Sequence, residues 1–286
     1  MSEEPTDSTQ VKARIRQEWD QRAAGWRTWW EIFERGAQAL SDHMVTLAQI
    51  DAGQRILDIA TGIGEPAITA ARRVGPAGHV VAIDQAPQML AIARERAATL
   101  ALHNIEFREL DAERLDLLEE RFDALLCRWG LMLLPRLVPA LQRMRHRLLP
   151  GGRFAAAVWP AAPKVPVMSL PMAVISQSIQ MPPPPPGYQG PFSLADREAL
   201  EQTFIQAGWS SLQSEAFPVT AEFASAGEYV RFLQATSPLS AVLAKLGVEQ
   251  QEHIWQAIRE TVQERYGRAD GTIFIPNETT CLLARP

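Results

Sequence analysis

Cysteine, histidine, basic tracts and long apolar runs are all scarce in this sequence of 286 residues. Its two cysteines, Cys127 and Cys281, match no metal-binding spacing and are too few for a disulfide framework, which fits a reducing cytoplasm. The formal net charge is −5, so a small molecule is favoured over nucleic acid as the main partner. No apolar run has membrane length, and residues 2–10 lack the apolar centre of a signal peptide. These absences predict a soluble, cytoplasmic protein without a membrane span.

The scarcity of histidine limits the choice of a general base. His43 lies beside the apolar stripe of Leu40 and Met44, and His253 lies in a late helical region that we expect to line a pocket. The sequence has no convincing Ser/His/Asp order, paired-carboxylate spacing or metal-ligand cluster. His43 and His253 are therefore the only catalytic candidates, and no metal is expected.

The chain is organised around residues 55–67, which read as a buried strand, a glycine turn and the start of a helix. Asp58 interrupts the apolar strand, and a carboxylate there is expected to point out of the strand end toward a ligand. Gly62 and Gly64 permit a tight turn, and Pro66 suits the first turn of a helix. The free N–H groups of that helix are expected to hold an anion. Such a site suits a ligand that carries both an amino and a carboxylate group.

From residue 54 to residue 159 the pattern alternates strand and helix, which predicts a parallel sheet with right-handed crossovers. We expect an α/β fold with a doubly wound, seven-stranded, mostly parallel sheet, an N-terminal helical cap and a C-terminal helical insertion. The expected strands span residues 55–59, 79–83, 105–110, 122–126, 153–159, about 211–220 and 279–284.

Composition divides the chain into four expected parts. Residues 11–50 read as helices and contain four of the eight tryptophans, and a later segment contains the proline run 182–186. These parts are a tail and helical cap (1–50), a cofactor-binding core (51–160), a proline-rich insertion (161–192) and a segment that completes the sheet and adds a helical cap over the substrate (193–286).

The glycine turn alone does not identify the ligand. Asp84 follows Gly62 by twenty-two positions, a spacing that also describes dinucleotide-binding domains, so a nicotinamide-dependent oxidoreductase is one reading. Asp58, however, would repel a pyrophosphate and attract an ammonium group. A third strand end carries Asp111, whose carboxylate can accept a hydrogen bond from an exocyclic adenine amine. These acidic strand ends favour an adenosyl ligand with an amino group.

With polar residues at four successive strand ends, Asp58, Asp84, Asp111 and Arg128, the sequence resembles the class I S-adenosylmethionine-dependent methyltransferases. The resemblance spans residues 55–159. Two later patterns, residues 191–196 and 207–209, look like the small-molecule branch near the ubiquinone and menaquinone C-methyltransferases. The resemblance implies the Rossmann-like methyltransferase fold and S-adenosyl-L-methionine as cofactor.

In that family the glycine loop lies at the amino-acid end of the cofactor. The acid at the position of Asp84 binds the ribose hydroxyls, and the pair at the position of Asp111 and Ala112 contacts the adenine. Ala60 and Thr61 depart from the small glycine or cysteine residues common there. The cofactor-binding residues that the resemblance implies are Asp58, Ala60, Thr61, Gly62, Gly64, Asp84, Gln85, Met89, Asp111, Ala112 and Arg128.

The expected reaction is O-, C- or N-methylation of a small, apolar or aromatic acceptor. Aromatic residues of the early cap, of the fourth strand end and of the late helices are expected to line its pocket: Trp26, Trp30, Trp129, Tyr229, Phe232 and Trp255. The alternatives are an NAD(P)-dependent oxidoreductase and a non-catalytic S-adenosylmethionine-binding protein. We expect a monomer or homodimer.

Overall fold

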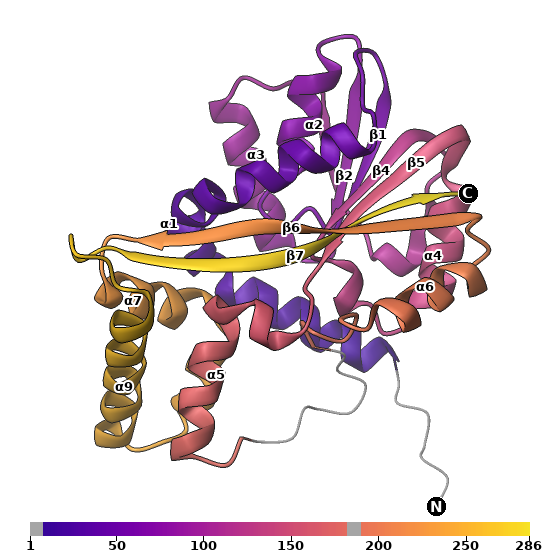
Figure 1. The fold of residues 1–286 in the computed structure, drawn as a ribbon. Helices are drawn as coiled ribbons and strands as arrows, with labels where there is room; N and C mark the ends of the chain where they lie inside the picture. The colour runs from indigo at the N-terminus through magenta and orange to yellow at the C-terminus, as the bar shows by residue number, and fades with distance from the viewer. Residues whose placement is uncertain (1–7, 182–189) are drawn as a thin grey trace, which may run out of the picture.

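The computed structural model describes residues 8–181 and 190–286, so the proline run 182–186 lies outside the described residues. The strands are β1 Arg55–Ile59, β2 His79–Asp84, β3 Ile105–Glu109, β4 Phe122–Arg128, β5 Leu148–Val158, β6 Ser211–Phe223 and β7 Ile273–Arg285. They form one seven-stranded sheet in the order β3-β2-β1-β4-β5-β7-β6 (Figure 1). Only β7 runs against its neighbours in this described sheet. The expected seven-stranded, mostly parallel α/β fold is confirmed.

Nine α-helices and three short 3₁₀ helices in the described residues flank or extend the sheet. The α-helices are α1 Ser8–Leu47, α2 Ala67–Val74, α3 Pro87–Thr99, α4 Leu137–His146, α5 Pro166–Ser178, α6 Arg197–Gln206, α7 Ala226–Thr236, α8 Leu239–Leu243 and α9 Val248–Tyr266. The 3₁₀ helices are η1 Ala112–Leu117, η2 Leu131–Leu133 and η3 Ala162–Lys164. No helix in the described part of the chain is both long and apolar enough to span a membrane.

The central strands are buried on both faces, which explains their nearly continuous apolar sequences. On one face, alternate residues of β1, β2, β4 and β5 pack against η1, α4 and α6. On the other face, the intervening residues pack against α2 and the C-terminal half of α1. The carboxyl ends of β1 and β4 are neighbours, and the chain order reverses between them. Ligands of open α/β sheets bind at such a reversal, so the fold directs attention there.

The N-terminal region is one helix of 40 residues rather than the several helices expected. At 1.5 Å per residue it is about 60 Å long. Gly25 and Gly36 lie inside it, where glycine disfavours helix formation relative to alanine. A Cβ at Gly25 would overlap the carbonyl oxygen of Ala235, and one at Gly36 would overlap that of Thr220. Both glycines therefore allow α1 to lie directly against the backbone of α7 and β6.

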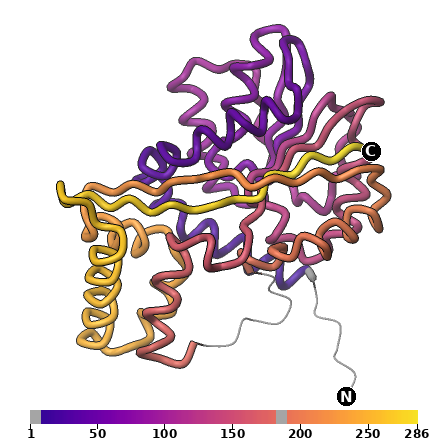
Figure 2. The backbone as a smooth tube through the Cα atoms, viewed as in Figure 1, coloured from indigo at the N-terminus to yellow at the C-terminus, as the bar shows by residue number. Residues whose placement is uncertain are grey.

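The late helices gather at one end of a long ribbon formed by β6 and β7 (Figures 1 and 2). The two strands pair along their whole length, from Ser211 with Arg285 to Phe223 with Ile273, and are longer than expected. Helices α5, α7, α8 and α9 share a buried apolar cluster with the far part of the ribbon. The region expected to be helical between residues 225 and 266 thus contains three helices, which cover one end of the ribbon.

Candidate functional site

Asp58 is fully buried at the carboxyl end of β1. Its Oδ2 accepts a hydrogen bond from the N–H of Ala67, 3.1 Å away at the start of α2. Its Oδ1 has no hydrogen-bond partner among the described residues. Burial raises the pKa of Asp58 to about 7, although the Thr61 hydroxyl and the charge of Arg128 each lower it in part. The carboxylate does not point freely out of the strand as expected: one oxygen binds the next helix, and the other remains available.

The glycine turn after β1 has left-handed backbone conformations at Ala60, Gly62 and Gly64, with φ of 56°, 54° and 102°. This region is uncommon for a residue with a side chain, so Ala60 is the strained position of the turn. A Cβ on Gly64 would lie 3.0 Å from the side chain of Ile68, which leaves almost no space for one. Beside the turn, the Oγ1 of Thr61 is buried without a hydrogen-bond partner among the described residues.

The N–H groups of the first turn of α2 are already bonded within the protein. Asp58 accepts from one of them, and the carboxylate of Glu65 accepts from the N–H of Thr69 at 3.3 Å. The N–H groups of Ile68 and Ala70 donate to the backbone carbonyls of Gly64 and Pro66. The expectation that they hold a ligand's anion is therefore wrong, because two buried acids and the turn's own carbonyls satisfy them.

Asp84 joins the end of β2 to the glycine turn. Its Oδ2 accepts from the N–H of Gly62 at 2.8 Å, and its Oδ1 accepts from the N–H of Ala86 at 2.9 Å. Burial raises the pKa of Asp84, and these N–H groups oppose the rise. Gln85 is half-buried beside it, and the buried Met89 packs over the turn at Gly62. Asp84 is thus half-buried at the strand end, and its carboxylate supports the turn.

Asp111 caps η1 and meets the first turns of α1. Its Oδ1 accepts from the N–H of Glu113 at 2.8 Å, and its Oδ2 lies 2.7 Å from the Nζ of Lys12. Lys12 also lies 2.7 Å from the Oε2 of Glu113, which is fully buried. Ala112 is buried next to this pair. The lysine therefore already binds the carboxylate for which the sequence predicts an adenine contact, and that contact stays a prediction.

Arg128, at the end of β4, is bound to α1. Its Nη1 and Nη2 donate to the two carboxylate oxygens of Glu34 at 2.8 and 2.5 Å, and Nη1 also donates to Ser41 Oγ at 3.0 Å. Burial alone would lower the pKa of Arg128, but Glu34 and two further acids nearby raise it. Arg128 is thus paired with Glu34 in this structure, and the direct cofactor contact predicted for it stays a prediction.

A buried ionic group beneath α1 was not anticipated from the sequence. It contains Glu34, Glu65 and Arg96 in addition to Arg128, all less than one tenth exposed. Burial and the nearby charge of Glu34 raise the pKa of Glu65, while Arg128, Thr69 and Arg96 lower it in part. The only sequence signal for this group is a set of charges among the tryptophans of α1 and next to the glycine turn.

The cap tryptophans cover the glycine turn. Trp26 and Trp30 pack on a cluster that contains Ile63 of the turn and Met89 of α3. Trp26 also contacts the late helices, with its ring centroid 6.2 Å from that of Phe232. The structure thus brings Trp26 and Trp30 to the glycine turn, and it brings Phe232 to Trp26.

Trp129 directly follows β4 in a left-handed conformation. Its ring stacks on Trp159 with centroids 4.3 Å apart, and its Nε1 donates to Thr279 Oγ1 at 3.0 Å. It also meets the edge of Phe33 on α1, with ring centroids 5.6 Å apart, and the guanidinium carbon of Arg128 lies 5.1 Å from its ring centroid. Trp129 therefore lies between the end of β4 and the cap, and its place in an acceptor pocket stays a prediction.

Two of the late aromatics are core residues rather than pocket walls. Tyr229 is fully buried, and its hydroxyl donates to the carbonyl of Val167 at 2.9 Å. Trp255 is 9% exposed and packs in the same apolar cluster between the late helices. Their placement in a pocket was wrong because the helical segment needs its own core, which these large side chains fill.

Neither candidate histidine reaches the strand ends around Asp58. His253 is exposed on α9, so it does not line a pocket. His43 stacks on Phe217, and its Nε2 lies 2.6 Å from Glu215 on the edge strand β6. Two strands, β5 and β7, separate that strand from β4. The prediction of either residue as a base therefore has no support in the geometry.

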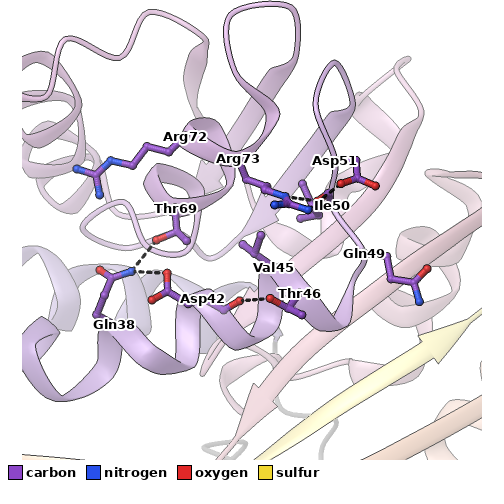
Figure 3. A pocket seen from close by; sticks show the side chains of 10 residues that line it. All are labelled: Gln38, Asp42, Val45, Thr46, Gln49, Ile50, Asp51, Thr69, Arg72 and Arg73. Carbon is purple, nitrogen blue, oxygen red and sulfur yellow. Dashed lines mark hydrogen bonds and ion pairs between the residues drawn. The ribbon is translucent and has the colours of Figure 1, made fainter.

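A polar hollow of about 780 Å³ lies between the end of α1 and α2, away from the aromatic cap (Figure 3). Gln38 bridges Asp42 and Thr69 on one side of it, and Arg73 binds Asp51 on the other. Its wall contains none of the residues predicted to bind the cofactor or acceptor. It is therefore not the predicted acceptor pocket.

Comparison with known proteins finds similarity over the part of the chain that contains the glycine turn. Residues 50–169 match the family described as "Methyltransferase domain". A ubiquinone/menaquinone biosynthesis C-methyltransferase from Pseudomonas putida is 38% identical over 111 residues, which are 38% of this chain and 43% of that protein. The chain spans less than two thirds of the length of the curated relatives it matches.

Two solved structures share the fold at low sequence identity. The YcgJ protein of Bacillus subtilis has a TM-score of 0.56 at 16% identity, with 87% of this chain and 99% of that chain covered. The [4+2]-cyclase SpnF has a TM-score of 0.51 at 20% identity, with 88% and 82% covered. Residues 50–169 are thus similar in sequence to methyltransferase domains, in agreement with the resemblance described above, and the two solved structures share the fold.

Proposed function

We propose that this protein transfers the methyl group of S-adenosylmethionine to a small, apolar or aromatic organic acceptor. The observation that carries the proposal is Asp58 Oδ1, a buried carboxylate oxygen beside the glycine turn that makes no hydrogen bond of ordinary geometry to a described residue and lies near the Thr61 hydroxyl. A buried polar atom without a partner costs about 1 to 3 kcal/mol, so this carboxylate oxygen favours a ligand that donates a hydrogen bond. An ammonium group is a donor of this kind, and it also favours the ionised form of Asp58.

The residues around the turn fit the other parts of the cofactor. Each oxygen of Asp84 accepts one backbone N–H, and a carboxylate oxygen has capacity for a second donor, which a ribose hydroxyl supplies. Gln85 and Met89 flank that position, and Asp111 and Ala112 follow the next strand. When bound, S-adenosylmethionine supplies an electrophilic methyl group on a positively charged sulfur.

The protein's own contribution is to position the reactants and exclude water. Trp26 and Trp30 pack beside the glycine turn and Trp129 follows β4, and an aromatic face left uncovered there attracts a sulfonium by about 1 to 2 kcal/mol when water is excluded. Holding an acceptor in line with the methyl group lowers the barrier by about 7 to 11 kcal/mol. No histidine reaches these strand ends in the described structure, so the proposal assigns the rate enhancement to positioning rather than to a named base.

The charges around the turn disfavour a nicotinamide dinucleotide. Asp58 and Glu65 flank the turn with buried carboxylates, and they occupy N–H groups of α2 that a pyrophosphate would need. The spacing from Gly62 to Asp84 alone therefore does not support an NAD(P)-dependent oxidoreductase. A binding protein without methyl transfer is the second alternative, since the fold also occurs in a [4+2]-cyclase and does not by itself define a reaction.

We further propose that residues 51–160 form the cofactor-binding core. The cap (1–50), the insertion 161–192 and the segment 193–286 then enclose the acceptor. Phe232 supports this division because it joins the late helices to Trp26 of the cap. A monomer or homodimer remains the predicted oligomeric state.

Calorimetric titration tests the proposal with S-adenosylmethionine, S-adenosylhomocysteine and NADH in parallel. We expect both adenosyl ligands to bind and NADH not to bind. The variant Asp84→Asn should weaken binding by about 1.5 to 3 kcal/mol, because an amide replaces a charged acceptor. Asp51→Asn is the control, since Asp51 is an exposed acid paired with Arg73 far from the turn.

Thermal melts of each variant are needed beside the titrations, because Asp84 also supports the glycine turn. Equal cofactor affinity in wild type and a folded Asp84→Asn variant would contradict the ribose assignment. Binding of NADH without either adenosyl ligand would refute the proposed function. Tight binding of S-adenosylmethionine without methyl transfer to any of a panel of aromatic acceptors would favour the non-catalytic alternative.

A further inference from the structure

Arg96 of α3 lies between the glycine turn and the aromatic cap. Its Nη1 donates to the carbonyl of Ile63 in the turn at 2.6 Å. Its Nη2 lies 3.6 Å from Glu65 Oε1, and its guanidinium carbon lies 4.2 Å from the ring centroid of Trp30 on α1. One side chain thus contacts the turn, the acid that bonds to the first turn of α2, and the cap.

The three contacts require a guanidinium. Its planar group stacks on an aromatic face while its edge donates in fixed directions, and an ammonium group cannot do both. Arg96 is only 9% exposed. The buried carboxylates of Glu34 and Glu65 support its charge against this burial. A cation over a tryptophan ring is attracted more strongly in such buried surroundings than at an exposed site.

The apolar contacts connect the same parts. The side chain of Ile63 packs in one cluster with Met89 of α3, and Trp26 and Trp30 of the cap pack against that cluster. The carbonyl of Ile63 is the acceptor of the Arg96 hydrogen bond. A shift of the turn therefore moves both a hydrogen-bond acceptor of Arg96 and an apolar neighbour of the cap.

We propose that Arg96 is a positioning residue that couples the glycine turn to the aromatic cap, so that a cofactor in the turn orders α1 before the acceptor binds. This rests on the proposed function, because it takes the turn as the cofactor's site. Arg96 touches neither reactant in this scheme. It holds Trp30 against the turn, and the cap closes over the acceptor side as a unit with the turn.

Hydrogen exchange of residues 19–34 of α1, with and without S-adenosylhomocysteine, tests the coupling. In the wild type the ligand should slow exchange of this segment by at least about fivefold, the lower end of typical coupling between sites. In Arg96→Lys the ligand should still slow exchange in residues 60–65, but its effect on residues 19–34 should fall below about twofold. Undiminished slowing in residues 19–34 of that variant overturns the proposal.

Two further variants separate coupling from general loss of stability. Arg94→Lys is the matched control, since Arg94 lies on the same helix and donates to the carbonyl of Phe107 instead; it should behave as the wild type. Trp30→Leu removes the stacked ring and leaves Arg96 intact. In this variant, as in Arg96→Lys, the ligand should slow exchange of residues 19–34 by less than about twofold. If Arg96→Lys does not fold, the test rests on Trp30→Leu. Undiminished slowing of exchange in residues 19–34 of Trp30→Leu by the ligand then refutes the coupling.

Failure of the proposed function gives a different result. In that case S-adenosylhomocysteine changes exchange nowhere in the wild type, and the ligand-free proteins are compared. Faster exchange of both residues 19–34 and residues 60–65 in Arg96→Lys, but not in Arg94→Lys, supports the link between turn and cap. Exchange equal to that of Arg94→Lys in either segment overturns it.

Discussion

Replacing Asp58 by asparagine keeps the size of the side chain and removes its ionisation. In the folded protein burial raises the pKa of Asp58 from 3.8 to about 7. Below about pH 4 the carboxyl is protonated in the folded and unfolded states, so burial carries no charge penalty. As pH rises from about 4 to about 7 the unfolded chain releases its proton first, and the wild type loses stability. The difference in pKa corresponds to a loss of about 4 kcal/mol, at about 1.36 kcal/mol per unit.

Urea unfolding of wild type and Asp58→Asn at pH 4, 5.5, 7 and 8 measures this loss. Glu65 and Asp84 are also raised in pKa by burial and act in the same direction, so the informative quantity is the difference between the two proteins. Relative to the wild type, the variant should gain stability as pH rises and level off above about pH 7. Asp51→Asn, at an exposed acid, is the control for loss of a surface carboxylate. A difference that is flat with pH would refute the burial argument.

Three other substitutions follow from the packing. Gly36→Ala should destabilise the protein by about 1 to 3 kcal/mol in urea unfolding, because the added Cβ overlaps a carbonyl of β6. Gly227→Ala is the control and should not destabilise the protein, because its Cβ would make only ordinary contacts. Tyr229→Phe should cost about 0.5 to 1.5 kcal/mol of stability by removing its hydrogen bond to the half-buried carbonyl of Val167, and a change in cofactor affinity without that loss would contradict its core position. Lys12→Met should strengthen S-adenosylhomocysteine binding by up to about fivefold in calorimetry, since it frees Asp111; unchanged or weaker binding would count against the adenine assignment.

The sheet and the turn were predictable because their determinants are local. Short apolar runs, each followed by an acid or a glycine turn, mark β1 and β2, and their ends lie within one residue of the expected positions. The last two strands are longer than expected for a physical reason. Their far halves leave the sheet and pair only with each other, so half-exposed residues replace the apolar runs that mark a buried strand.

The ionic contacts under the cap were not predictable because they are remote in sequence. Glu34 and Arg128 are 94 positions apart, and only the packing of α1 across the strand ends brings them together. The length of α1 was also missed, because glycines inside a helix usually indicate an interruption. Here Gly25 and Gly36 mark contacts with other backbone segments instead. Arg96 gave no signal, since arginines are common on exposed helix faces.

The two ends of the segment that carries α7, α8 and α9 meet at one place. Phe223 and Ile273 are directly paired in the ribbon, and paired residues of antiparallel strands have Cα atoms about 4.5 to 5.5 Å apart. A two-residue turn spans that gap. The intervening segment therefore leaves and rejoins the ribbon at one point, so exchanging it for another would cut no strand of the sheet. A replacement has to offer Gly25 the backbone surface that Ala235 now provides, and it has to fill the core shared with α5 and the ribbon. Under the proposed division of the chain, such an exchange would change the residues around the acceptor and leave β1 to β5 and the glycine turn intact.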